Sequence, residues 1–233
     1  LCRAKDLKLI RLKMSAKSIA LAFRNVGYHC RIGSSTLLGE LALAVMFYVG
    51  NRVFIHYLGD TGVGAYGIAC YYMPFFFMVG NSIAQSAQPI ISYNYGIDRW
   101  TRIVEARKVL LMTCLGFGVA VSLIFILFPK GLVGLFIPIE SEAAIIAING
   151  FPLLSIGILF FILNVAIIGY YQSVERMGKA TLYVFLKGFV FIVPCFLILP
   201  KFLGTVGIWL AMPASELLTS LFIALSVLPS RLK

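Results

Sequence analysis

Long apolar runs alternate with short polar connections along the whole chain. About 20 residues of α-helix cross a bilayer core about 30 Å thick, and six runs reach that length. They lie near 34–56, 63–93, 109–128, 143–171, 180–199 and 204–228. The connections contain turn-forming residues, among them Gly59, Gly62, Gly96, Pro129, Gly178 and Gly204. The pattern predicts an all-α polytopic membrane protein, a bundle of six transmembrane helices within 33–229.

Composition indicates the same class. The 233 residues are 61% hydrophobic and 12% charged, whereas a soluble domain is about a quarter charged. So little polar surface cannot cover a soluble fold in water. The five cysteines contain no C-x-x-C pair and read as small buried hydrophobic residues.

Basic residues lie mainly on one side of the predicted spans. Of the 20 Lys and Arg residues, 16 lie in 1–32, in the connections after the second and fourth spans, and at the end of the chain. The opposite connections hold only Lys130 and Lys201. By the positive-inside rule, both termini are predicted to be cytoplasmic, with the protein in the cell membrane. The net charge of +11 follows from this asymmetry, so no nucleic-acid partner is expected.

The segment 1–32 mixes basic residues with apolar ones, as helices on a membrane surface do. We expect it to be a basic cytoplasmic connector or an interfacial helix. The last residues, 230–233, are expected to form a cytoplasmic tail.

Ionisable residues occur inside the predicted spans, where each costs about 2.5–3.5 kcal/mol on insertion scales and needs a partner, a water-filled cavity or a function. They are Glu40, Arg52, Lys187 and Glu216. Glu40 has no basic residue one helical turn away, so its carboxyl is free to take up a proton or a cation, and we expect it to be the ion-coupling residue. Lys187 either snorkels toward the cytoplasm or pairs with a carboxylate. For Lys187 and Glu216 a structural and a coupling role both stay open.

A polar stripe runs along the second half of the second predicted span, within "GNSIAQSAQPIISYNYG". Its members are Asn81, Gln85, Gln88 and Ser92. Their offsets of four, three and four residues place them on one face of a helix. Amides facing lipid would lack hydrogen-bond partners, so the stripe either bonds to other helices or lines an aqueous cavity. We favour the cavity.

Motifs of enzymatic chemistry are absent from the sequence. It contains no P-loop, no H-E-x-x-H and no G-x-S-x-G. His29 and His56 have no partner at metal-ligand spacing. We therefore expect no enzymatic activity, no cofactor and no structural metal.

Four stretches resemble the C-terminal half of a multidrug and toxic compound extrusion (MATE) transporter of the bacterial type. They are "LGDTGVGAYGI", "GNSIAQSAQPIISYNYG", "YYQSVERMGKATLY" and "GIWLAMPASELLT". The resemblance implies one six-helix lobe of a twelve-helix transporter, with 1–32 as the connector between lobes. It also implies exchange of Na⁺ or H⁺ for organic cations by alternating access, and a partner that is either the missing N-terminal lobe or a second copy.

The resemblance also implies roles for single residues. Glu40 matches the acidic position of the family's seventh helix, which is implicated in cation binding. Where one sodium-coupled branch has an aspartate and a tyrosine, the fourth span here offers Asn164 and Tyr170, which we expect to line the cavity. No Asp or Glu stands there, so the coupling ion, H⁺ or Na⁺, stays open.

Two other functions fit six spans. One is a lipid-linked oligosaccharide flippase of the same superfamily, whose cavity should be rich in basic residues to hold pyrophosphate. Only Lys187 and Arg52 lie in spans here, which argues against it. The other is an accessory membrane protein that binds a partner and transports nothing.

Overall fold

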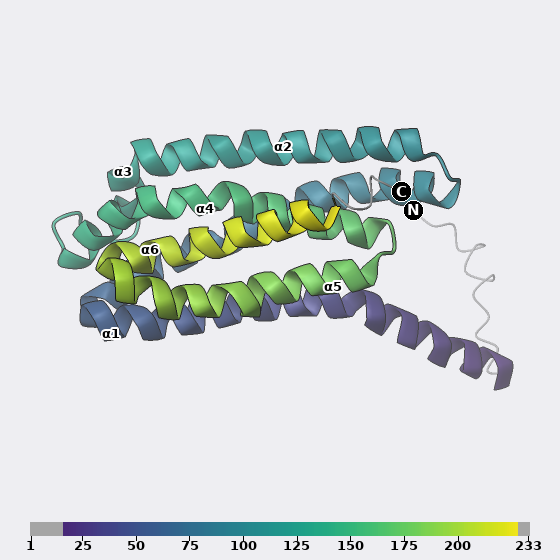
Figure 1. The fold of residues 1–233 in the computed structure, drawn as a ribbon, viewed down its shortest axis with the longest axis horizontal. Coiled ribbons are helices and arrows are strands. Elements are labelled where there is room, and N and C mark those ends of the chain that lie inside the picture. Colours follow the sequence, from purple (N-terminus) through teal and green to yellow (C-terminus); the bar gives the residue numbers. More distant parts are fainter. Residues whose placement is uncertain (1–15, 228–233) are drawn as a thin grey trace, which may run out of the picture.

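The computed structural model describes residues 16–227 as a bundle of long helices (Figure 1). Its elements are α1 (Ala16–Gly96), α2 (Trp100–Leu127), α3 (Pro129–Gly134), α4 (Glu142–Ser173), α5 (Met177–Phe185), the π-helical segment η2 (Leu186–Phe191) and α6 (Ile192–Val227). Within these described residues there is no strand. The prediction of an all-α fold is confirmed.

The chain reverses direction inside α1 and again inside α6. Gly59 (φ 65°, ψ −157°) and Gly204 (φ 57°, ψ −133°) leave the helical conformation there. A positive φ brings Cβ into steric conflict with the backbone, and glycine has no Cβ. The reversal in α1 brings the Tyr66 hydroxyl to the carbonyl oxygen of Met46, to which it donates a hydrogen bond of 3.0 Å.

These reversals turn four helices of membrane length into six passes. The passes are 16–58, 60–96, 100–127, 142–173, 177–203 and 205–227. The expected spans fall on them, but residues 16–32 continue the first pass as one helix. α2 begins at Trp100 rather than near 109, because its first turns are charged and leave no hydropathy signal. The rest of the expected connector, 1–15, and the expected tail, 230–233, lie outside the described residues.

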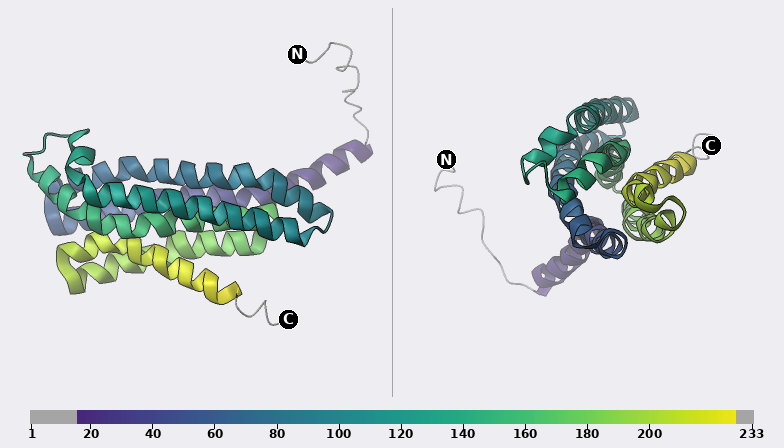
Figure 2. Two further views of the ribbon diagram at one scale, coloured as in Figure 1. Left: turned by 90° about the horizontal axis from the view of Figure 1, so that it is seen from above. Right: turned by 90° about the vertical axis from the view of Figure 1, so that its left-hand side faces the viewer.

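α4 lies at the centre of the bundle and packs against α1, α2 and α6. In its most apolar window 61% of the residues are buried, against 28–39% in the other membrane-length helices. Ser141 caps its N-terminus, where the hydroxyl oxygen accepts the amide N–H of Ala144 at 3.2 Å. α4 is thus the scaffold against which the other passes are positioned. Figure 2 shows the passes running along one common axis, with the first turns of α1 projecting beyond the bundle.

The two ends of the bundle differ in charge. The turns near 97–99 and 174–176 lie together at one end, and the turns at Gly59 and Gly204 lie at the other with α3 (Figure 1). The first end carries the basic residues Arg99, Arg102, Arg107, Lys108, Arg176 and Lys179. The connections at the opposite end contribute Lys130 and Lys201. The fold therefore gathers on one end the charges that the sequence distributes over separate connections.

Gly188 lets the π-helical segment pack closely against α1. A Cβ built at this glycine would overlap with the Cβ of Ala42, whereas a Cβ at Gly178 in α5 meets no atom within 4 Å. We expect Gly188→Ala to destabilise the protein by about 1–3 kcal/mol through overpacking. Gly178→Ala, the matched control, should be neutral or slightly stabilising because alanine favours helix. Thermal unfolding in detergent measures both, and equal effects would contradict the close approach.

Candidate functional site

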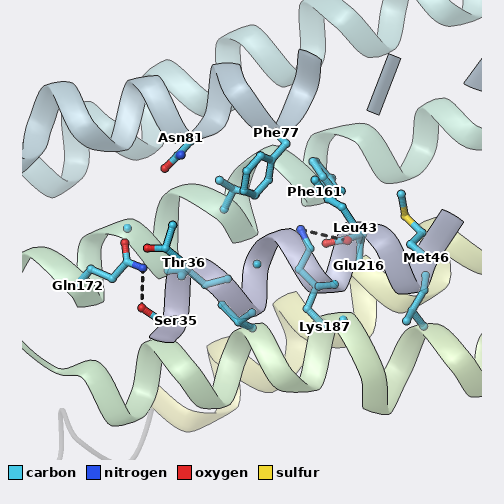
Figure 3. Close-up of a pocket in the computed structure, with 18 residues that line it drawn as sticks. Ser35, Thr36, Leu43, Met46, Phe77, Asn81, Phe161, Gln172, Lys187 and Glu216 are labelled. Atoms are coloured by element: carbon cyan, nitrogen blue, oxygen red, sulfur yellow. Dashed lines mark hydrogen bonds and ion pairs between the residues drawn. The ribbon is translucent and has the colours of Figure 1, made fainter. Parts of the chain in front are cut away.

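A small cavity lies between both halves of α1, α4, the segment from α5 to η2, and α6 (Figure 3). Its volume is about 60 Å³, which is room for a few water molecules. Most of its wall is apolar. The polar side chains in the wall are Ser35, Thr36, Asn81, Gln172, Lys187 and Glu216.

An ion pair is buried in the wall of this cavity. The Nζ atom of Lys187, from η2, lies 3.2 Å from Oε1 of Glu216, from α6. The Glu216 side chain is 2% exposed and that of Lys187 is 11% exposed. The sequence left two alternatives for Lys187, snorkelling or pairing with a carboxylate, and in the structure it pairs with Glu216. A pair so far removed from water holds its geometry through direct contacts, because either charge alone would be costly to bury.

Asn164 of α4 fixes the other carboxylate oxygen. Its Nδ2 donates to Oε2 of Glu216 at 2.8 Å and to the main-chain oxygen of the same residue at 2.9 Å. Its own Oδ1 accepts the hydroxyl of Ser220 at 2.9 Å. Asn164 is fully buried. The residue that the sequence assigned to the cavity wall therefore orients the carboxylate from behind.

The ammonium group of Lys187 also faces an aromatic ring. Nζ lies 3.7 Å from the centroid of the Phe161 ring, which belongs to α4. A cation at this distance from a ring face is attracted by the ring quadrupole, and more so when it is desolvated. The lysine stands in η2, where the wider π-helical turn changes the direction of successive side chains. Sequence periodicity gave no signal for this ring or for the π-helical segment.

A second polar contact lies at the opposite side of the cavity. Nε2 of Gln172 donates to Oγ of Ser35 at 2.9 Å, joining the end of α4 to α1 (Figure 3). Neither residue was predicted to belong to the site. A signal was present, because both are uncharged polar residues near the ends of predicted spans. Hydropathy alone does not separate such residues from ordinary helix ends.

The predicted polar stripe divides between three environments. Asn81 is half-buried and lines the cavity. Gln85 and Gln88 are exposed on the surface of the bundle. Ser92 instead donates its hydroxyl to the carbonyl oxygen of Ser173 at 2.9 Å, a contact between helices.

Two other predicted residues lie outside the cavity wall. Glu40 is exposed on the first pass, one helical turn beyond Thr36, which does line the cavity. Tyr170 is half-buried, and its ring centroid lies 5.5 Å from Cζ of Arg107 in α2. Three exposed polar residues lie within two helical turns of the wall residues Thr36 and Asn81 on the same two passes. They are Glu40, Gln85 and Gln88, and the five residues together are called the polar face below.

The described part of the chain contains no group of three or more His, Cys, Asp and Glu side chains placed to hold a metal ion. The chemistry that the site offers is the recognition of charge by one buried carboxylate, one ammonium group, amides and aromatic rings.

Comparison with known proteins gives a consistent result. The MatE family model matches residues 36–197. No curated protein matches the chain by sequence. A multidrug resistance MATE family transporter of the MOP superfamily, in an outward-facing conformation, superposes with a TM-score of 0.79 at 16% identity over 92% of this chain and 47% of its own.

Two further solved structures have the same fold. A mutant of the Vibrio cholerae MATE transporter VcmN has a TM-score of 0.80 at 16% identity over 90% of this chain and 47% of its own. A MOP superfamily transporter from Pyrococcus furiosus, described as having a binding pocket of reverse polarity, has a TM-score of 0.75 at 16% identity over 83% of this chain and 44% of its own. The chain thus spans about half the length of these relatives.

At such low identity the superpositions establish the fold, a multi-pass helical membrane lobe, and not the chemistry of the site. Membership rests on the family match, which covers well over half of the chain. The chain belongs to the MatE family, the MATE transporters, and corresponds in length to one lobe of such a transporter.

Proposed function

We propose that this chain is one lobe of a cation-coupled antiporter that exports organic cations by alternating access. The observation that carries the proposal is the polar face, whose members Thr36 and Asn81 line a cavity in the membrane-spanning part of the bundle and whose members Glu40, Gln85 and Gln88 are exposed. Exposed amides and a carboxylate facing hydrocarbon would be costly. On the wall of a water-filled path between two lobes they are solvated and can contact a moving cation.

The proposal includes a covering partner. Gln85, Gln88 and Glu40 are exposed on the isolated bundle, and the chain matches about half of the length of its solved relatives. A missing N-terminal lobe or a second copy of this chain would cover the polar face and complete the path. The same proposal places the protein in the cell membrane, with the basic end of the bundle and both termini toward the cytoplasm.

Glu40 is the proposed ion-coupling residue. The described residues include two carboxylates within the predicted spans, Glu40 and Glu216, and the second is already paired with Lys187. Glu40 lies on the polar face, where water from alternating sides would reach it. H⁺ and Na⁺ both suit a carboxylate in that position.

The geometry does not favour the flippase alternative. Pyrophosphate would need cationic groups that are free to bind it. Within the spans predicted from the sequence the basic residues are Arg52, toward the Gly59 turn, and Lys187, whose ammonium group is held by Glu216.

The test is transport of a fluorescent organic cation in proteoliposomes, with a MATE N-terminal lobe supplied beside this chain. We expect efflux driven by a Na⁺ or H⁺ gradient from the assembled protein, and none from the monomeric chain alone. Absence of flux from every assembled form, with the protein folded and inserted, would favour the accessory-protein alternative.

A further inference from the structure

The buried carboxylate of Glu216 has a cation attached to the protein itself. Oε1 lies 3.2 Å from Nζ of Lys187. The same ammonium group meets the face of Phe161, with 3.7 Å between Nζ and the ring centroid. One carboxylate oxygen and one ring face thus form an enclosure for a cationic head group.

The enclosure suits an ammonium ion better than a bare metal ion. Hard metal cations in proteins are held by several oxygen ligands. Here Oε2 of Glu216 accepts Nδ2 of Asn164 at 2.8 Å, and the amide oxygen of Asn164 accepts Ser220 at 2.9 Å. The oxygens nearest to the carboxylate therefore already have partners, whereas the ring of Phe161 supplies the quadrupole that attracts organic cations.

The enclosure is also connected to a space that a ligand could enter. Lys187 and Glu216 form part of the wall of the cavity of about 60 Å³, which extends to Thr36 and Asn81 of the polar face. In Figure 3 the Nζ–carboxylate contact lies at one side of this cavity and Asn81 at the other. A head group entering from the polar face would reach the carboxylate without unfolding any helix.

We propose that Glu216 and Phe161 form a binding site for a primary alkylammonium group, occupied in this state by the side chain of Lys187. The lysine acts as a tethered ligand. An external ammonium group binds when the lysine side chain is absent or displaced, and alkali-metal ions do not take its place. The inference concerns binding alone and does not depend on the transport proposed above.

The test removes the tethered ligand and supplies it again from solution. Lys187→Ala deletes three methylene groups and the ammonium group, which together correspond to n-propylammonium. We expect n-propylammonium chloride to raise the thermal midpoint of the full-length variant in detergent by about 3–6 °C at ten times its Kd. NaCl at the same ionic strength should produce no such saturable shift. A midpoint that responds equally to both salts would show that the site does not select ammonium and would overturn the proposal.

A double variant provides the control. Lys187→Ala combined with Glu216→Gln keeps the enlarged space but removes the charge, so n-propylammonium should no longer raise its midpoint. An undiminished shift would place the amine elsewhere and contradict the site. If Lys187→Ala folds only with added ligand, we expect n-propylammonium during purification to recover it and NaCl to fail. Recovery with neither contradicts the proposal.

The unmodified protein provides an independent measurement. Na⁺ is titrated at constant ionic strength, balanced with the bulky cation N-methylglucamine, and the thermal midpoints of wild type and Glu216→Gln are compared. We expect any Na⁺-dependent shift of the midpoint to be the same in both proteins. A saturable Na⁺ response that disappears in Glu216→Gln would identify this carboxylate as a metal-ion site and overturn the assignment.

Discussion

Glu40→Gln is expected to abolish ion-driven efflux of organic cations in the assembled transporter while leaving folding and insertion intact. The amide has nearly the shape and hydrogen-bonding capacity of the acid but cannot carry the charge. Ion and drug need only favour different conformations of the protein, because coupling is a differential affinity. Removing the charge that distinguishes the conformations removes the coupling. Since Glu40 is exposed outside the cavity wall, the change creates no buried unpaired group.

The measurement is ion-driven accumulation of a fluorescent cation in proteoliposomes at matched protein density. Glu105→Gln is the control, because it makes the same chemical change at an exposed glutamate whose partner is the surface residue Arg102. We expect the control to transport like wild type and Glu40→Gln to fall to the level of empty vesicles. Normal coupled flux in Glu40→Gln would move the coupling to Glu216 or to the other lobe.

Lys187→Met should cause the largest loss of stability of any single substitution in the cavity wall. It leaves the carboxylate of Glu216 buried without its cation, a change that typically costs about 3–5 kcal/mol. Glu216→Leu should lower the free energy of unfolding by a similar amount, because it leaves the ammonium group of Lys187 buried without its carboxylate. The double variant should recover most of the loss, because two apolar side chains of similar volume need no partner there.

Thermal unfolding of the four proteins in detergent gives the coupling free energy of the pair. Arg102→Met is the control for loss of an ion pair. Its partner is Glu105, and the two side chains are 69% and 58% exposed, so the expected cost is about 0–1 kcal/mol. Additive losses in the double variant would mean that Lys187 and Glu216 act independently, contrary to the structure.

The six passes could be predicted because they depend on local properties of the sequence. Apolar length defines a membrane-crossing helix. The two reversals fall at Gly59 and Gly204, where a positive φ combined with a strongly negative ψ favours glycine. The extension of α2 back to Trp100 could not be predicted from hydropathy, because charged residues continue a helix in water without lengthening the apolar run.

The site was less predictable because it depends on contacts between helices. Periodicity places residues on a face of their own helix, but it does not determine which residue of another helix lies opposite. Glu216 and Lys187 could each be identified as needing a partner, and the pairing between them was one of several alternatives. To predict that Phe161 lies against Lys187, one would need to know how α4 is aligned along η2. The π-helical turn also changes the spacing of side chains in η2, so ordinary helical periodicity does not apply there.

The polar stripe shows the same limit in a different form. Asn81, Gln85 and Ser92 share one helical face, as their spacing predicted, but they meet a cavity, open surface and the carbonyl oxygen of Ser173 in turn. A stripe is a property of one helix, whereas its surroundings change along the helix. Tyr170 is comparable, since its neighbour is Arg107 of α2 rather than the cavity.

The claim that the polar face lines a water-filled path is tested most directly by the accessibility of single cysteines. In the assembled transporter, depleted of native cysteines, Gln85→Cys and Gln88→Cys are compared with Ile90→Cys. Ile90 is exposed on the same helix, about 200° around the axis from Gln88. We predict that a water-soluble thiol reagent modifies the two glutamine positions at least about tenfold faster than Ile90→Cys, and that an organic cation substrate slows only those two reactions. Equal, substrate-independent rates at all three positions would contradict the account.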